Sequence, residues 1–159
     1  MRKIIKKDRI SFDTLFLSIV KLLELRSTCL RRKVGAVLVR DNIILATGYN
    51  GVPRGLSHCQ ECIRDKYNIP SGQRMEFSRA VHAEQNVLIQ CALKQTNPES
   101  SVLYCSCLPC VTCSKMLIQA GVKKIVYIED YDDGLNKEIL KESNIELIQF
   151  TNFNFGDIL

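Results

Sequence analysis

Apolar residues recur along this chain with two different spacings, and the alternation of those spacings predicts its secondary structure. Helical spacing begins after Ser11, a residue type that commonly caps a helix start, and continues to about residue 26. Two segments rich in β-branched residues, 34–40 and 43–49, flank a two-residue turn and predict an antiparallel hairpin. The stretch 51–72 contains glycine and proline, lacks periodicity and predicts a long functional loop.

The second half of the chain alternates helices with strands. Helical patterns cover 81–93, 109–120 and 135–142, and strand patterns cover 102–106, 124–129 and 145–150. Pro109 suits the first turn of its helix, and Gly121 suits the residue that ends it. The resulting order, α-β-β-α-β-α-β-α-β, predicts a layered α/β fold with a mixed five-stranded sheet.

The length of 159 residues fits a single domain, which we place at 11–150 between a basic tail (1–10) and a C-terminal tail (151–159). The composition, 46% hydrophobic and 25% charged, is globular, and no stretch reaches the roughly 18 apolar residues that span a bilayer. We therefore expect no membrane partner. The N-terminus lacks the apolar stretch of a signal peptide, so the expected location is cytoplasmic.

The net charge of +5 is concentrated at the N-terminus. Residues 1–10 contain five basic side chains and one acidic side chain, which gives +4, so the rest of the chain is nearly neutral. A basic tail of this kind is more often a solvated terminus than a polyanion site, and we do not expect nucleic acid as a partner. Eight cysteines in a reducing compartment indicate metal ligands, reactive thiols or core residues rather than disulfides.

Two short motifs bring together residue types that bind zinc. One is His82-Ala83-Glu84, and the other is Pro109-Cys110-Val111-Thr112-Cys113. A catalytic zinc site uses three protein ligands and keeps one position for water, and one histidine with two cysteines fits that number. The i, i+3 spacing places the two sulfurs one helical turn apart on one face. We predict one catalytic Zn²⁺ per chain, held by His82, Cys110 and Cys113.

Glu84 falls on the apolar stripe of its predicted helix, where an unpaired carboxylate is costly. A proton-transfer role explains its place, because a glutamate outside the metal shell is the general acid/base of zinc deaminases, whose pattern H-x-E…P-C-x-x-C both motifs match. In an ideal helix His82 and Glu84 would point about 200° apart. They can serve one metal only from the first turn, so we predict a helix start within a residue or two of His82.

Further stretches make the chain resemble the deoxycytidylate deaminases of the cytidine deaminase superfamily, from about Ser11 to Phe150. They are Arg26-Ser27-Thr28-Cys29-Leu30-Arg31-Arg32-Lys33-Val34-Gly35-Ala36, Gly48-Tyr49-Asn50-Gly51-Val52-Pro53-Arg54-Gly55 and His82-Ala83-Glu84-Gln85-Asn86. The resemblance implies a three-layer α/β/α fold and zinc-dependent hydrolysis of dCMP to dUMP and ammonia, with Glu84 moving the protons. It also implies a homo-oligomer, dimer or hexamer, with dCTP and dTTP as candidate allosteric ligands.

Candidate substrate-binding residues come from chemistry and from the resemblance. Arg31 and Arg32 lie in a basic run that suits a 5′-phosphate, because guanidinium groups bind phosphate oxygens in pairs; a solvated helix end is the alternative. The resemblance implies Asn50 near the sugar, Tyr131 near the nucleotide, and Ala83 among the residues that bind substrate. For Asn50 and Tyr131 the plainer alternatives are a turn residue and a surface aromatic.

The resemblance also implies a second, structural zinc, which many members of that family hold. Cys29 and Cys59 match two of its ligands, but Ser78 stands where relatives often have a cysteine. Cys62, which forms a close loop pair with Cys59, or neighbouring His58 would then complete the metal shell. The ligands of this second site therefore stay open.

Three alternatives to a dCMP deaminase stay open. Cys107, Cys110 and Cys113 form a C-x₂-C-x₂-C run that also occurs in iron–sulfur proteins, and a purely structural zinc site would use similar residues. A tRNA adenosine deaminase, or a deaminase of another cytosine nucleotide, would share the metal chemistry. A regulatory protein would keep the fold and bind nucleotides without turnover.

The remaining cysteines, Cys91 and Cys105, occupy apolar positions and are assigned to the core.

Overall fold

One mixed five-stranded sheet carries the structure, and helices pack on both of its faces. The computed structural model describes residues 9–131, 134–151 and 153–157. In chain order its elements are α1 (Phe12–Glu24), β1 (Gly35–Arg40), β2 (Ile43–Tyr49), α2 (Ile63–Lys66), α3 (Ala83–Leu93), β3 (Val102–Cys107), α4 (Val111–Gln119), β4 (Lys124–Glu129), α5 (Leu135–Glu142) and β5 (Glu146–Gln149).

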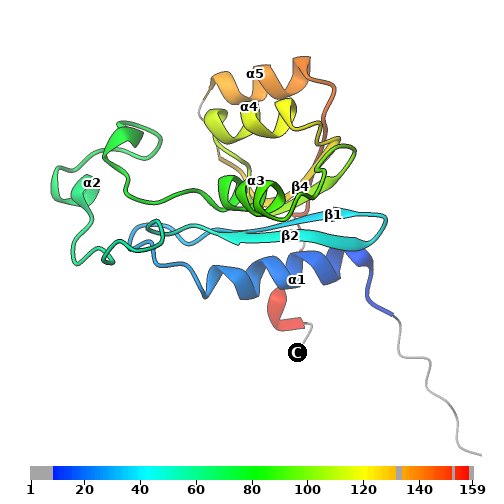
Figure 1. Ribbon diagram of the computed structural model, residues 1–159, viewed down its shortest axis with the longest axis horizontal. Coiled ribbons are helices and arrows are strands. Elements are labelled where there is room, and N and C mark those ends of the chain that lie inside the picture. The colour runs from blue at the N-terminus through cyan, green and yellow to red at the C-terminus, as the bar shows by residue number, and fades with distance from the viewer. Residues whose placement is uncertain (1–8, 132–133, 152, 158–159) are drawn as a thin grey trace, which may run out of the picture.

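The strands lie in the order β2-β1-β3-β4-β5. β1 pairs antiparallel with β2 and β3, whereas β3, β4 and β5 run parallel. α1 covers one face of the sheet, and α3, α4 and α5 cover the other (Figure 1). The predicted three-layer α/β/α fold class with a mixed five-stranded sheet is confirmed.

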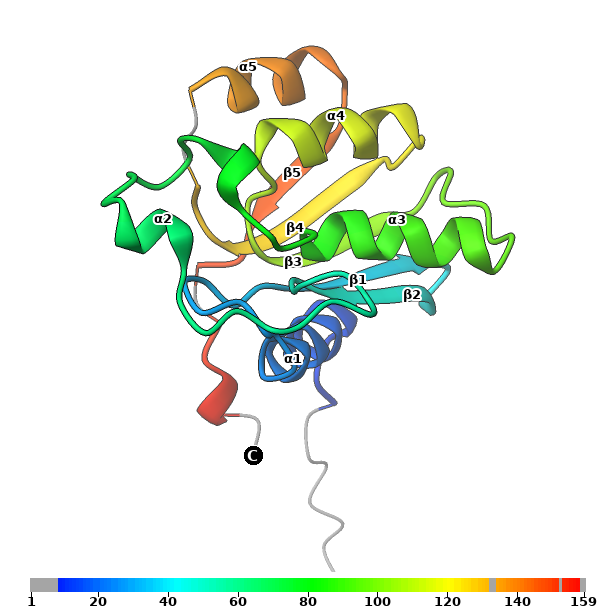
Figure 2. The same cartoon turned by 60° about the vertical axis from the view of Figure 1, so that its left-hand side comes forward.

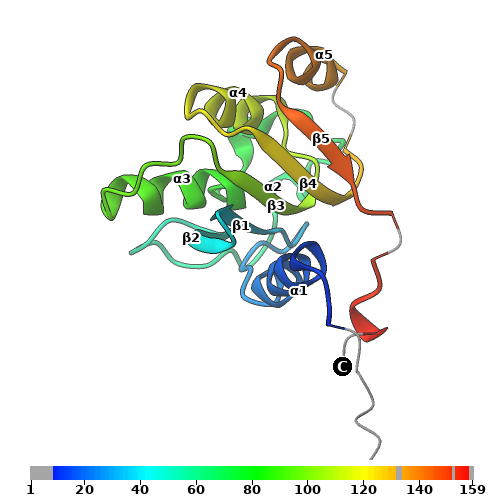
Figure 3. The same cartoon turned by 90° about the vertical axis from the view of Figure 1, so that its right-hand side faces the viewer.

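Each face of the sheet has its own apolar cluster, because alternate residues of a strand point to opposite faces. In β1, Ala36 and Leu38 join the cluster that includes residues of α3, α4 and α5, whereas Val37 and Val39 join the cluster that includes residues of α1. Figure 3 shows α4 and α5 above β4 and β5, with α1 on the opposite side of the sheet. Because both faces of β1 are buried, its sequence is a nearly continuous run of apolar residues.

The β1–β2 hairpin leads the chain toward the cavity described below. Asp41 and Asn42 have φ of 53° and 61°, the conformation that a tight two-residue hairpin turn requires. Near the other end of β2, a Cβ atom on Gly48 would lie 2.3 Å from the carbonyl oxygen of Ala83. Because glycine lacks that atom, the first turn of α3 can lie directly against β2.

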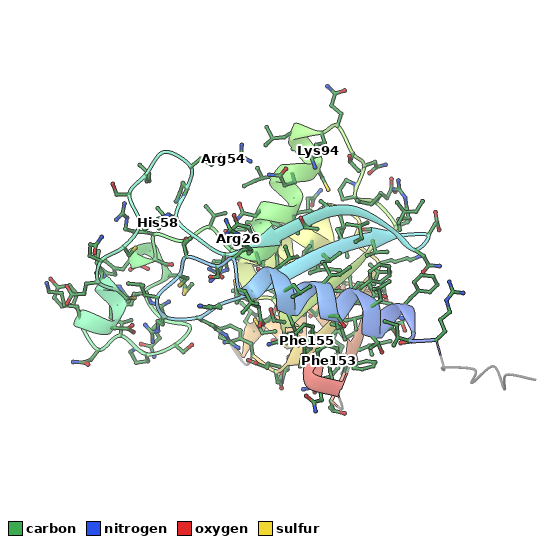
Figure 4. The ribbon with its side chains drawn as sticks, turned by 90° about the horizontal axis from the view of Figure 1, so that it is seen from below. Arg26, Arg54, His58, Lys94, Phe153 and Phe155 are labelled. Carbon is green, nitrogen blue, oxygen red and sulfur yellow. The ribbon has the colours of Figure 1, made fainter. Side chains whose placement is uncertain are left out.

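The segment between β2 and α3 projects beyond the end of the hairpin (Figure 1). Most of the long loop predicted over 51–72 is irregular, but the short helix α2 lies within it, and a 3₁₀ turn follows at Met75–Phe77. A single helical turn is too short to leave a hydrophobic period in the sequence. In Figure 4, Arg54 and His58 lie on this segment, away from Phe153 and Phe155 near the C-terminal end.

The C-terminal segment returns to the α1 side of the sheet. Phe150 and Phe153 pack against the α1-side cluster, with their ring centroids 6.2 Å apart. Residues 1–8 of the predicted basic tail, and residues 152, 158 and 159 of the predicted C-terminal tail, lie outside the described residues. In the part of the chain that the structure describes, no helix has the length and apolar character to cross a bilayer.

Candidate active site

The start of α3 positions His82 and Glu84. His82 is the N-cap residue, with φ −71° and ψ 157°, and α3 begins at Ala83, so the predicted helix start is confirmed. The Gln85 side chain accepts a hydrogen bond from the His82 N–H at 2.8 Å, and the Asn86 side chain donates to the last carbonyl of β2 at 2.8 Å. The stretch from His82 to Asn86 therefore stabilises its own helix start and ties it to the sheet.

The start of α4 positions the two cysteines. This helix begins at Val111 with Cys110 as its N-cap, so the predicted opening at Pro109 is two residues early. The carbonyl oxygen of Pro109 instead accepts a hydrogen bond from the buried Asn136 side chain at 2.6 Å. Cys113 lies buried in the first turn of the helix. In Figure 2 both α3 and α4 begin on the side where the segment carrying α2 lies.

The three predicted zinc ligands converge. His82 Nδ1 lies 3.5 Å from Cys110 Sγ and 3.3 Å from Cys113 Sγ. A tetrahedral zinc ion, bound at about 2.3 Å to sulfur and about 2.0 Å to nitrogen, holds such atoms roughly 3.5 Å apart. Among the described residues, His82, Cys110 and Cys113 are the one group of three or more histidine, cysteine or acidic side chains close enough to share a metal ion. The residues therefore fit Zn²⁺.

Glu84 lies in the first turn of α3 with only 3% of its surface exposed, so the predicted burial of this carboxyl group is confirmed. Burial raises the pKa of the Glu84 carboxyl, and the nearby imidazole of His82 offsets part of that effect. A raised pKa brings a carboxyl group closer to neutral pH, where it can both accept and release a proton. Burial and a raised pKa are expected of a proton-transfer group, and the catalytic role of Glu84 stays a prediction.

Hydrogen bonds connect the side chains of the predicted zinc ligands and shift the pKa of each. The contact with Cys113 lowers the pKa of Cys110 to about 4, and the same contact raises the pKa of Cys113 far above its usual value. A hydrogen bond to Cys110 raises the pKa of His82. Zinc binds thiolates and neutral imidazole, so binding would displace the protons of these groups. The arrangement is that of a ligand group ready to exchange protons for a cation.

A cavity of about 460 Å³ opens onto these residues and is lined by His82, Glu84 and Cys110. Its size falls within the range of pockets that bind small molecules. The cavity wall also includes all five candidate substrate-binding residues, which are Asn50, Arg31, Arg32, Tyr131 and Ala83. The structure thus brings the predicted catalytic and binding residues to one place, although it does not test their roles.

The side chain of Asn50 has a structural task besides lining the cavity. Its Oδ1 accepts hydrogen bonds from Ser27 Oγ at 2.6 Å and from the Val34 N–H at 2.8 Å, and its Nδ2 donates to the carbonyl of Arg32 at 2.7 Å. These bonds tie the segment before β1 to the end of β2. One Nδ2 proton is left for a ligand. Binding to the sugar stays a prediction that this remaining donor permits.

The two candidate arginines belong to the cavity wall rather than to a helix end, because α1 ends at Glu24. Arg32 Nη2 lies 3.2 Å from Glu129 Oε2, and its guanidinium lies 5.3 Å from the centre of the Tyr131 ring. Arg31 donates from Nη2 to the carbonyl of Ile69 at 2.8 Å. The Tyr131 ring thus has a cationic neighbour in the wall, so it is not an isolated surface aromatic.

The candidate ligands of a second zinc reach the same cavity without forming a metal group. Cys29, His58, Cys59 and Cys62 all line it, as does Ser78. Among the described residues, however, they do not form a group of three or more ligand atoms close enough to share an ion. The second zinc stays a prediction. The other assigned thiols, those of Cys91 and Cys105, are buried in the core as predicted.

Sequence reasoning missed three residues around this site. Asn136 is fully buried in α5, and its side chain donates a hydrogen bond to the Pro109 carbonyl. The sequence could have revealed it, because Asn136 lies four residues before Leu140 and therefore on the same apolar face of the helix. Arg64 and Arg79 line the cavity, but they come from the irregular segment after β2, where no period marks an inward-facing residue.

Comparison with known proteins identifies the family. The family model of the cytidine and deoxycytidylate deaminase zinc-binding region matches residues 10–129. The deoxycytidylate deaminase of Schizosaccharomyces pombe is 37% identical over 145 residues, which cover 89% of this chain and 45% of that protein. The corresponding enzyme of Saccharomyces cerevisiae is 34% identical over 144 residues, which cover 90% of this chain and 46% of that protein. The chain spans about half the length of these two relatives.

A solved structure extends the comparison over a whole chain. The crystal structure of dCMP deaminase from the cyanophage S-TIM5, in complex with dCMP and dUMP, is 31% identical to this chain with a TM-score of 0.74. The match covers 89% of this chain and 100% of the cyanophage chain. The family model covers the segments that carry His82, Cys110 and Cys113. The chain belongs to the cytidine and deoxycytidylate deaminase family, which is defined by its zinc-binding region.

Proposed function

We propose that this protein is a zinc-dependent deaminase that hydrolyses dCMP to dUMP and ammonia. The observation that carries the proposal is the convergence of His82, Cys110 and Cys113 beside a cavity. That cavity is lined by His82, Cys110 and the buried Glu84. Three ligands leave one coordination position for water, which is the arrangement of a catalytic rather than a structural zinc site. The proposed deaminase domain covers residues 11–150.

The chemistry follows from the residues that line the cavity. When bound, Zn²⁺ would lower the pKa of a water molecule toward about 7 and so supply a nucleophile at neutral pH. Glu84 accepts the proton that this water loses, delivers it to N3 of the cytosine ring, and then helps to protonate the departing amine. Burial keeps the Glu84 carboxyl out of bulk water and close to the reacting atoms. His82, Cys110 and Cys113 would hold the ion during these proton transfers.

A nucleotide substrate is supported by the walls of the cavity and by the relatives. Arg31 and Arg32 line the cavity, and guanidinium groups suit phosphate oxygens. Both yeast relatives are named deoxycytidylate deaminases, and the cyanophage relative was crystallised with dCMP and dUMP. We place Asn50, Tyr131 and Ala83 in the same binding site because they line the same cavity.

The proposal has further parts. One catalytic zinc per chain follows from the three ligands, and the cytoplasmic location is the one expected from the sequence. Assembly into a homo-oligomer and regulation by dCTP and dTTP rest on the resemblance. A structural zinc bound by Cys29, Cys59 and Cys62 or His58 would raise the total to two per chain. The total zinc content of the purified protein separates these cases, since one ion per chain counts against the second site.

Ammonia release across a substrate panel tests the proposed function. The zinc-loaded protein is incubated with cytidine, deoxycytidine, CMP, dCMP, dCTP and a short tRNA stem-loop carrying adenosine. We expect dCMP to have the highest kcat/KM, and no ammonia from the tRNA. Preferred turnover of the tRNA substrate would overturn the proposal in favour of a tRNA deaminase. A coloured, iron-containing protein without deaminase activity would favour the iron–sulfur alternative instead.

A further inference from the structure

The cavity wall contains a buried positive charge that has no ion-pair partner among the described residues. Arg64 lies in α2 and is only 7% exposed. Its Nη2 donates to the carbonyl of Pro70 at 3.0 Å, while its Nε is buried with no hydrogen-bond acceptor. The ion pairs found among the described residues do not include Arg64. A buried guanidinium with an unused donor is costly unless an anion completes its contacts.

A second guanidinium lies next to it. Arg31 donates to the carbonyl of Ile69, the residue before Pro70, and its Nη1 is also buried without an acceptor. Because the two side chains bind successive carbonyls, the like charges of Arg31 and Arg64 are neighbours and repel each other. Asp65 lies 3.4 Å from Arg31 Nε, but its side chain is 53% exposed, so water screens its charge. Glu76 also interacts with the charge of Arg64, but it is exposed and already pairs with Arg74. These two exposed carboxylates leave the buried guanidinium groups without a buried counter-charge.

A third cation lies at the same cavity. Arg79 lines it, is exposed, and belongs to none of the ion pairs among the described residues. The same cavity contains Glu84 and His82 at the start of α3. It thus combines a group for proton transfer with a cationic wall built from the segment after β2. A cytosine nucleotide has the complementary pair of features, a base that reacts and a phosphate that carries negative charge.

We propose that Arg64 is the residue that selects a 5′-phosphorylated substrate, with its guanidinium binding the phosphate beside Arg31 while the base lies against Glu84. The inference rests on the proposed deaminase function and names the side chain that distinguishes a nucleotide from a nucleoside. Arg64 contacts the phosphate and not the reacting atoms, so its contribution is to substrate binding. Charge-assisted, paired hydrogen bonds to phosphate oxygens supply that binding.

The experiment compares the zinc-loaded wild type with Arg64→Met and Arg40→Met, each assayed with dCMP and with deoxycytidine. Methionine keeps much of the apolar stem of arginine and removes the charge. Arg40 is a matched control because it also donates to backbone carbonyls, those of Asn97 and Glu99, but does not line the cavity. We expect Arg64→Met to lower kcat/KM about 10- to 150-fold more for dCMP than for deoxycytidine, mainly through KM. Arg40→Met should leave the ratio of the two substrates unchanged.

A competition experiment and the activity of the wild type distinguish failure of this inference from failure of the proposed deaminase function. Inorganic phosphate should compete with dCMP in the wild type and compete more weakly in Arg64→Met, since the anion shares the phosphate subsite. An unchanged dCMP-to-deoxycytidine ratio in a zinc-loaded Arg64→Met protein would overturn the inference and leave the deaminase function intact. A wild type that releases no ammonia from dCMP would overturn both. If Arg64→Met does not fold, Arg64→Lys replaces it. A smaller shift of the ratio in the same direction is then expected, because lysine keeps the charge but lacks the planar fork.

Discussion

Replacing Glu84 with glutamine should lower kcat for dCMP by about 10²- to 10⁴-fold while the protein keeps its zinc and still binds dUMP. The amide has the same shape as the carboxyl group but cannot carry a proton between water, ring nitrogen and departing amine. Because Glu84 is buried and burial raises the pKa of its carboxyl, a neutral amide also removes a desolvation cost. The free energy of unfolding should therefore not decrease. Steady-state kinetics, metal analysis and denaturant unfolding measure the three quantities.

Glu146→Gln is the control for the glutamate replacement. Glu146 lies at the start of β5, pairs with Lys124 at 3.5 Å and has a 62% exposed side chain, so its amide variant should have wild-type kcat. If Glu84→Gln turned over dCMP at the wild-type rate, the proton-transfer role of Glu84 would be wrong. If the variant lost its zinc as well, the glutamate would belong to the metal site and not beside it.

Replacing Cys113 with alanine should remove the zinc and with it the deaminase activity. A residue that only orients a metal ligand typically contributes 10- to 100-fold to metal affinity, so the loss of a ligand should weaken binding more than about 100-fold. Cys113 lies 3.3 Å from His82 Nδ1 in the buried first turn of α4, and alanine offers no donor there. Dialysis against a chelator followed by metal analysis measures the loss. Thermal unfolding with and without zinc gives an independent reading, since a ligand stabilises only the state that binds it.

Cys91→Ala is the matched control for the cysteine replacement. Cys91 is a buried thiol in α3 outside the metal group, so its alanine variant should keep one zinc per chain and the activity. Full zinc retention by Cys113→Ala after dialysis would contradict the assigned ligand set. It would then point to another thiol at the site, and Cys107, which lines the same cavity, would be the first to replace.

The metal site could be predicted from the sequence because local rules fix most of it. His82 and Glu84 can face one ion only from a helix start, and α3 does begin at Ala83. Cys110 and Cys113 lie one turn apart at the start of the same helix. This holds whether the helix begins at Pro109, as predicted, or at Val111, as observed. The spacing within each motif thus determined its local geometry. The ligand number of a catalytic zinc and the zinc-deaminase pattern supplied the expectation that the two motifs meet.

The residues that the sequence left undetermined are those whose roles depend on tertiary contacts. From the sequence, Asn50 could be interpreted as a turn residue or as a ligand contact. In the structure its side-chain amide forms hydrogen bonds with Ser27, Arg32 and Val34, which only folding brings close to it. Gly48 is required by the approach of α3 and not by a turn. The cationic wall around Arg64 comes from a segment without periodicity, so no pattern could place that side chain inside.

The most direct test of the central claim is the fate of dCMP in water enriched in ¹⁸O. The zinc-loaded wild type is incubated with dCMP, and the products are analysed by mass spectrometry and an ammonia assay. We expect one ammonia for each dUMP formed and one ¹⁸O atom at C4 of the dUMP ring, because water is the nucleophile. Unlabelled dUMP, or no conversion of dCMP by a protein that holds its zinc, would contradict it.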